Sequence, residues 1–352
     1  MVVFFHFNRL HPHSDAPGIS HTISSVLMQP LRAGHESVIL FFVLSGFVLA
    51  LPYVNEKQQS YSVFVRRRIL RIYGPYLVAL AFAIAGCALW TGQSYLWESV
   101  SHVWSTPPRL KSVAAHVLFL GSYTSEYNLA FWSLVYEMRI SIIFPLLYFA
   151  LKKGLRAAFL TMAICFAIGF QPGGSLLGRW IGVNYLLTFE YAGIFAFGIL
   201  LAMGNQSLRV WFRGTSVYNK YALALVSFLL FEEGHVFMRT ASDESVFGDI
   251  PEALGAVGLI AITLHSARIS KLMTTAVPKF LGRISYSLYL VHCTVLFGLV
   301  AVFQRRVSDS LEFVTYLPLS ILLGWLFCRW VEEPFMRLSH KVGKKPAKLA
   351  TA

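Results

Sequence analysis

The chain has 352 residues, of which 56% are hydrophobic and 13% are charged. Soluble domains are typically about 45–50% apolar and about 25% charged, so this composition excludes an ordinary water-soluble fold. The formal net charge of +13 is a value that nucleic-acid-binding proteins also reach. The positions of the basic residues along the chain therefore matter more than their number.

Hydrophobic segments recur from one end of the chain to the other. About 20 helical residues, rising 1.5 Å each, cross a hydrocarbon core about 30 Å thick. The segments are a stub at Met1–Phe7, followed by Ser37–Val54, Tyr73–Thr91, Phe131–Leu151, Ala157–Phe170, Tyr185–Met203, Tyr221–Val236, Ala253–Ser266, Ser285–Phe303 and Phe313–Val331. Because a spanning segment must satisfy its own backbone hydrogen bonds, the sequence predicts an all-α bundle of about ten transmembrane helices, with the first one truncated in this chain.

Lysine and arginine alternate between the two sides of this predicted bundle. If the loop that holds the run Arg66–Arg71 is cytoplasmic, 20 of the 30 basic residues lie on that side, 8 lie on the opposite side, and Arg139 and Arg329 lie inside segments. This asymmetry follows the positive-inside rule. We therefore expect a multi-pass protein of the cell inner membrane that has both termini in the cytoplasm, contacts the lipid bilayer and binds no nucleic acid.

No stretch of the sequence indicates a separate soluble domain. We expect one transmembrane domain over residues 1–340 and a basic cytoplasmic tail over residues 341–352. All four cysteines lie in apolar segments, which argues against a disulfide framework. The histidines near His11 and His13 have no accompanying ligand set, so no metal is expected.

Polar residues inside the apolar segments are candidates for function, because intramembrane charge is costly. Glu137 and Arg139 are two residues apart and face different sides of a helix, so each needs another partner. Glu137 either pairs with an arginine of another helix for stability or takes part in chemistry. The small pair Ser45-Gly46 either allows two helices to pack closely or lines the path of a ligand.

The basic run and two histidines have similar alternative readings. Arg66, Arg67, Arg68 and Arg71 either anchor the helix at anionic lipid or bind the phosphates of a nucleotide-bearing donor. His6 ends the apolar stub, where an imidazole can exchange protons near neutral pH. For His292, inside a later segment, a hydrogen-bonded helix contact is favoured over direct chemistry.

Five motifs occur in the order of a known family. They are FFVLSG at 41–46, FVRRRILRIY at 64–73, WSLVYE at 132–137, GRISYSLYLVH at 282–292 and EEPF at 332–335. Through them, the chain resembles the membrane-bound acyltransferase family 3 over nearly its whole length. The resemblance implies transfer of an acyl group, often acetyl, from a cytoplasmic coenzyme A thioester to a hydroxyl, most often of a carbohydrate.

The family pattern pairs a histidine with an arginine eleven residues before it. His6 matches the histidine, and the arginine position lies before Met1, so we expect the native chain to start upstream. The resemblance then implies His6 as general base on the acceptor hydroxyl and acyl-CoA, acetyl-CoA first, as co-substrate. Glu137 is assigned as a second catalytic residue, which either orients the histidine or binds a sugar hydroxyl, and Arg67, Arg68 and Arg71 are assigned as coenzyme A ligands. Ser45, Gly46, Trp132 and Asp15 are assigned as acceptor contacts, although Trp132 is also typical of an interfacial anchor.

Two other functions fit the same segments. A transporter would also combine about ten spans with buried charge, although no inverted repeat is present. An inactive accessory subunit, lacking a complete first helix, is the other alternative.

Overall fold

The computed structural model describes residues 1–10, 33–92, 102–120, 125–170, 182–237, 246–304 and 306–343, and within these ranges every regular element is a helix. The elements are α1 (Val2–Leu10), α3 (Gly34–Val54), α4 (Tyr61–Arg68), the π-helix η1 (Ile69–Tyr73), α5 (Gly74–Trp90), α6 (Leu110–Val117), α7 (Phe131–Lys152), α8 (Leu155–Gly169), α10 (Val183–Gly214), α11 (Val217–Phe237), α12 (Val246–His265), α13 (Ala267–Met273), α14 (Ala276–Phe303), α15 (Asp309–Phe327), the π-helix η3 (Cys328–Glu332) and α16 (Glu333–Lys341).

The ten hydrophobic segments of the sequence fall, in order, on helices α1, α3, α5, α7, α8, α10, α11, α12, α14 and α15. Among the described residues, six helical stretches are long and apolar enough to cross a membrane, or seven if α12 and α13, bent by 91°, form one span. The all-α multi-pass membrane bundle is therefore confirmed. The count of about ten spans stays a prediction, because α1 has 9 residues and α8 has 15.

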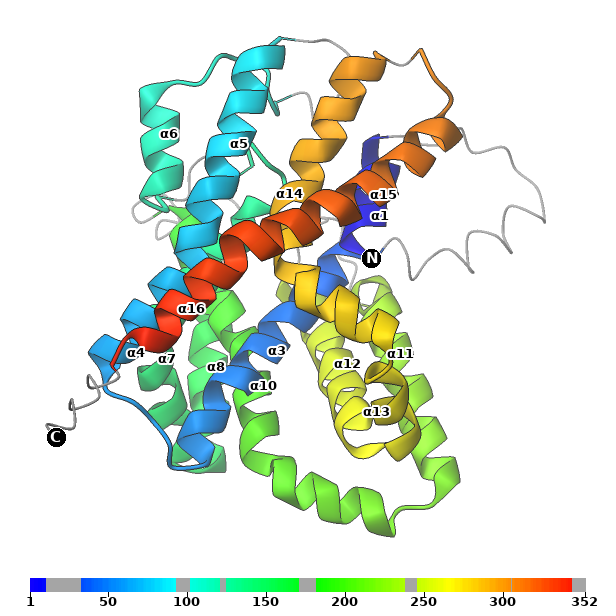
Figure 1. Cartoon of the computed structure of the whole chain (residues 1–352). Helices are drawn as coiled ribbons and strands as arrows, with labels where there is room; N and C mark the ends of the chain where they lie inside the picture. The colour runs from blue at the N-terminus through cyan, green and yellow to red at the C-terminus, as the bar shows by residue number, and fades with distance from the viewer. Residues whose placement is uncertain are drawn as a thin grey trace, which may run out of the picture.

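Two hydrophobic cores hold the bundle together, and α7 contributes to both. The first core joins α3, α8, α10, α11 and α12 through side chains such as Phe42 and Phe195, and Tyr136 of α7 packs in it. The second joins α1, α5, α14 and α15, and Phe131 at the start of α7 packs there. In Figure 1 the helices of the second core occupy the upper half and those of the first the lower half. The two cores therefore meet near the start of α7, between Leu134 and Tyr136.

Helices α3 and α10 approach each other backbone to backbone. A Cβ atom added at Gly46 would meet the carbonyl oxygen of Phe195, and one added at Gly198 would meet the carbonyl oxygen of Val43. Small residues allow two helix backbones to come this close. In a membrane, helices associate through van der Waals packing and not through the hydrophobic effect, so such close contact is favourable. Gly46 thus serves helix packing, and its predicted contact with an acceptor stays a prediction.

Each of the two π-helices extends a longer helix without interruption, and α14 supports both. The hydroxyl of Tyr286 on α14 donates to the carbonyl oxygen of Ile72 in η1 at 2.8 Å. The next residue, Ser287, donates to a carboxylate oxygen of Glu332 in η3 at 2.5 Å. Single π turns are uncommon and occur often at functional sites. Here they lie beside the arginine run and the carboxyl-terminal helix.

Candidate active site

A buried carboxylate of α7 is the centre of the first polar cluster. Glu137 is 2% exposed, and one oxygen, Oε1, forms an ion pair with Arg68 of α4. The hydroxyl of Ser45 donates to the same oxygen at 3.2 Å. The other oxygen, Oε2, is buried without a hydrogen-bond partner among the described residues. Because buried polar atoms are nearly always paired, Oε2 is available to accept a hydrogen bond from a bound ligand.

Arg68 links this cluster to the surface of the bundle. Its guanidinium also donates to the hydroxyl of Ser141, from Nε at 3.1 Å and from Nη2 at 2.8 Å. The same side chain lines a cavity of about 210 Å³. One residue therefore contacts both the buried carboxylate and the cavity.

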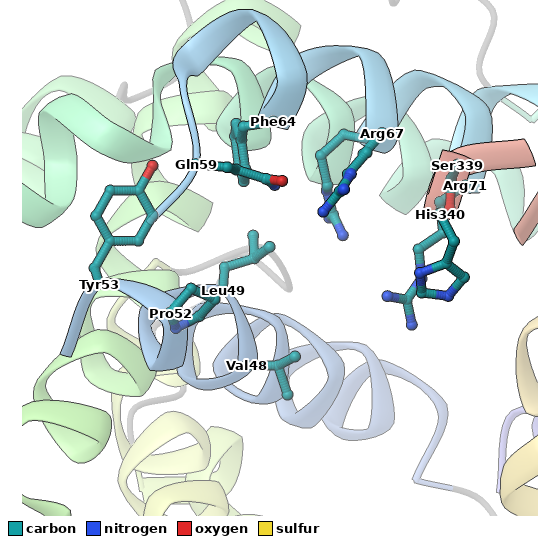
Figure 2. Close-up of a pocket in the computed structure, with 11 residues that line it drawn as sticks. Val48, Leu49, Pro52, Tyr53, Gln59, Phe64, Arg67, Arg71, Ser339 and His340 are labelled. Carbon is teal, nitrogen blue, oxygen red and sulfur yellow. The ribbon is translucent and has the colours of Figure 1, made fainter. Parts of the chain in front are cut away.

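The cavity is formed by α3, α4, η1 and α16 (Figure 2). Its walls are Val48, Leu49, Pro52, Tyr53, Gln59, Phe64, Arg67, Arg68, Arg71, Ser339 and His340. Figure 2 shows Arg67 and Arg71 extending from the α4–η1 helix toward α3, with His340 beside Arg71. An apolar floor with three guanidinium groups and an imidazole at its edge suits a molecule that carries both apolar and anionic parts.

The arginines of the run differ in their partners. Arg67 donates twice to the carbonyl oxygen of Val342, from Nε at 3.1 Å and from Nη2 at 2.8 Å. Arg71 has no hydrogen bond or ion pair within the described part of the chain. Arg66 is exposed, donates to the carbonyl oxygen of Ser62 at 3.2 Å and does not line the cavity. Arg67, Arg68 and Arg71 therefore line the cavity and Arg66 does not. These three arginines are the predicted coenzyme A ligands, and that role stays a prediction.

Two histidines form the second polar cluster. His6 of α1 and His292 of α14 are both buried, and Nδ1 of His6 lies 3.0 Å from Nε2 of His292. His292 therefore makes a hydrogen bond to another helix, with His6 as its partner, and the preference for a structural contact over a part in the chemistry stays a prediction. No hydrogen bond joins Glu137 to His6 in the described ranges. A role for Glu137 in orienting that histidine stays a prediction without a contact to support it.

Helix α14, which carries His292, is attached to the start of α7 through Tyr289. The hydroxyl of Tyr289 donates to the carbonyl oxygen of Ala130 at 2.9 Å and lies 2.6 Å from the hydroxyl of Ser133. These contacts fix α14 against the start of α7, one turn before His292.

Two groups among the described residues place three possible metal donors within 4.8 Å of one another. One is His6, His292 and Cys293. The other is His35, Asp249 and Glu252, in which Nε2 of His35 lies 2.8 Å from Asp249 Oδ1. The distance between His35 and Asp249, and the 3.0 Å between His6 and His292, are both hydrogen-bond distances. The sequence-based expectation that no metal is used stays a prediction.

Trp132, another predicted acceptor contact, does not line the arginine cavity. Trp132 packs among aromatic rings that include Tyr191, with ring centroids 5.8 Å apart, and stacks at 6.4 Å on the imidazole of His35. Asp15 lies outside the described residues. Arg139 faces away from Glu137, as expected, and donates to the carbonyl oxygen of Phe119 at 2.6 Å.

Comparison with known proteins assigns the family. A family model described as an acyltransferase domain, of the acyltransferase 3 type, matches residues 1–329. The chain belongs to the acyltransferase 3 family. This acyltransferase is 26% identical over 348 residues to the acyltransferase MdmB of Streptomyces mycarofaciens, covering 90% of the chain and 84% of that relative. It is 24% identical over 357 residues to the O-acetyltransferase PaAT-1 of Phomopsis amygdali, covering 84% of the chain and 70% of that relative. No solved structure matches.

The family assignment makes the protein a membrane acyltransferase, and of the two relatives PaAT-1 is named as an O-acetyltransferase. Two parts of this acyltransferase's polar clusters were not predicted from the sequence. Ser339 and His340 complete the arginine cavity from α16, and the tail after the EEPF motif gave no signal beyond its basic charge. The contact between His6 and His292 joins residues 286 positions apart, which no local pattern reveals.

Proposed function

We propose that this acyltransferase transfers an acyl group, acetyl first among the candidates, from acyl-CoA to a hydroxyl of a carbohydrate or a related acceptor. The observation that carries the proposal is the cavity lined by Arg67, Arg68 and Arg71. Coenzyme A carries several phosphates, and guanidinium forks bind phosphate with two parallel hydrogen bonds. The positive-inside asymmetry supports a cytoplasmic position for the cavity, with the protein in the inner membrane.

The position of Arg68 supports a path from this cavity into the bundle. Because its guanidinium contacts both the cavity and Glu137, a donor held by the arginines extends its thioester end toward the buried carboxylate. Glu137 Oε2 then accepts a hydrogen bond from a hydroxyl of the acceptor. Family membership favours this transfer reaction over the transporter alternative.

The chemistry requires deprotonation and alignment, because a thioester is already activated. His6 takes the proton of the acceptor hydroxyl, and the hydroxyl oxygen attacks the thioester carbonyl carbon. The carbon–sulfur bond then breaks, the ester remains on the acceptor, and the leaving coenzyme A thiolate takes the proton from His6, which returns the base to its neutral form. A positioned general base contributes about 10²–10⁴-fold to such a rate, and holding two substrates together contributes further.

The arginine cavity is tested by comparing two members of the same basic run. Arg71→Gln removes a cation that lines the cavity, whereas Arg66→Gln removes one that does not. A hydrogen bond to a charged group contributes about 1.5–3 kcal/mol, so Arg71→Gln should weaken acetyl-CoA binding by about 10- to 150-fold. Calorimetric titration of the purified full chain measures this. Equal affinity of the two variants would rule out the cavity as the donor site.

The acceptor class is tested in cells. Mass spectrometry of surface glycans from a deletion strain should show the loss of one ester. Recovery of that ester by the parent gene, and not by the His6→Ala variant, connects it to this site. An unchanged glycan profile would argue against a carbohydrate acceptor.

A further inference from the structure

We propose that His292 is a positioning residue, which holds His6 in the tautomer that has a proton on Nδ1 and a basic lone pair on Nε2. The inference rests on the proposed role of His6 as general base. It adds to that role the group that makes one particular nitrogen of His6 the base.

The proton of His292 is placed by the backbone of its own helix. Nδ1 of His292 lies 3.0 Å from the carbonyl oxygen of Leu288 and 2.9 Å from that of Tyr289. Carbonyl oxygens only accept hydrogen bonds, so Nδ1 carries a proton. In a neutral imidazole the second nitrogen is then an acceptor, and Nε2 of His292 holds a lone pair.

The same logic fixes His6. Its Nδ1 lies 3.0 Å from Nε2 of His292, and two lone pairs cannot share a hydrogen bond, so Nδ1 of His6 carries the proton. Nε2 of His6 is left with the lone pair that a general base needs. The thiol of Cys293, 3.3 Å from Nε2 of His292, acts as a weak donor to the same nitrogen and is consistent with this assignment.

Burial keeps both rings neutral before the reaction. His292 is fully buried and His6 is 7% exposed, and two adjacent cations in the bundle would be strongly disfavoured. When Nε2 of His6 takes a proton from the acceptor, the ring becomes cationic, and its Nδ1–H donates a charge-assisted hydrogen bond to His292. Such bonds are about twice as strong as neutral ones, so the contact stabilises the charge that forms during the reaction.

An isosteric pair of variants at one position tests the inference. Glutamine at His292→Gln places an amide oxygen near the former Nε2, whereas His292→Met has similar length and no comparable acceptor. We expect His292→Met to lower kcat by about 10- to 150-fold, the contribution of a hydrogen bond to a charged group, without changing the KM for acetyl-CoA. His292→Gln should keep kcat within about threefold of the parent, because its amide oxygen still accepts the hydrogen bond.

Another buried histidine supplies the matched control. His116 on α6 is 4% exposed, and its Nδ1 lies 2.9 Å from the carbonyl oxygen of Ser112, one turn earlier. It resembles His292 in burial and in its backbone bond but does not contact His6. His116→Met should lower thermal stability while leaving kcat unchanged. If the Met variant at His292 fails to fold, His292→Asn replaces it, because its amide ends short of the former Nε2.

The tautomer itself can be observed by nitrogen NMR of the histidine-labelled full chain in detergent. In the parent and in His292→Gln, His6 should show a protonated Nδ1 and an unprotonated Nε2, and in the variant without the acceptor a mixture of tautomers. A kcat within threefold of the parent in that variant would overturn the inference. If His6→Ala stays active, the base assignment itself fails; if it is inactive while the acceptor-free variant is active, only the role of His292 fails.

Discussion

The backbone contact between α3 and α10 gives the sharpest stability prediction. In Gly198→Ala the new Cβ would meet the carbonyl oxygen of Val43 and would lie 2.6 Å from the amide nitrogen of Phe47. Ordinary van der Waals contact begins at 3.4 Å, and the carbonyl oxygen lies nearer than the amide nitrogen, so the two helices must separate by more than about 0.8 Å. Both neighbours are backbone atoms of a packed helix, which cannot rotate away as a side chain would.

The cost of this separation can be estimated from overpacking. Inserting a methyl group into a well-packed core costs about 1–3 kcal/mol. With an unfolding entropy of about 2.1 cal/mol/K per residue, this corresponds to a loss of about 1.5–4 °C in the Tm of the chain. Thermal unfolding of the detergent-purified protein, followed by tryptophan fluorescence, measures the shift.

Another glycine of α10 is the matched control. No heavy atom lies within 4 Å of a Cβ added at Gly204. Alanine is favoured over glycine in a helix by about 0.5–1 kcal/mol, so Gly204→Ala should raise the Tm slightly. If Gly198→Ala were as stable as Gly204→Ala, the close approach of α3 and α10 would be wrong, and with it the packing role of Gly46.

Two further predictions concern buried polar contacts. Glu137→Ala leaves the cation of Arg68 without its carboxylate and should lower the free energy of unfolding by about 3–5 kcal/mol. Adding Arg68→Met should recover part of that loss. Strictly additive losses in the double variant would contradict a direct ion pair. Tyr286→Phe removes the hydroxyl that donates to the carbonyl oxygen of Ile72 and should cost about 0.5–1.5 kcal/mol, whereas Tyr218→Phe, at a tyrosine that is 80% exposed, should leave thermal unfolding unchanged. Equal melting temperatures for the two phenylalanine variants would exclude this support of the π-helix.

The fold was predictable from the sequence because a bilayer imposes a simple rule. An apolar segment that enters hydrocarbon must be helical, so the ten segments of the sequence fall on ten helices in order. The number of spans was less predictable, because α8 and α1 are too short to decide from length alone. The bend between α12 and α13 depends on packing with other helices and has no signature in the apolar pattern.

The candidate site was predictable where chemistry is local. Glu137 was predictable because charge is costly in a membrane, and pairing with an arginine of another helix was one of its two expected roles. The arginine run was predictable because a dense basic cluster suits either anionic lipid or phosphate. Contacts between distant parts of the chain could not be found in this way. The pairing of His6 with His292 and the closure of the cavity by His340 depend on how α14 and α16 pack.

The π-helix η1 lies inside the continuous helical stretch Tyr61–Trp90 and sets the direction of the arginines on that stretch. Phe64, Arg68, Ile72 and Tyr76 follow one another at intervals of four, and the three apolar members are buried. In a regular α-helix each such step overshoots a full turn by about 40°, so three steps would rotate Tyr76 by about 120° away from Phe64. The wider turn of η1 (Ile69–Tyr73) reduces this drift. Deleting one residue there would rotate the arginine run by about 100° relative to α5, so the angular phase of the backbone, as much as the guanidinium itself, directs Arg68 to Glu137.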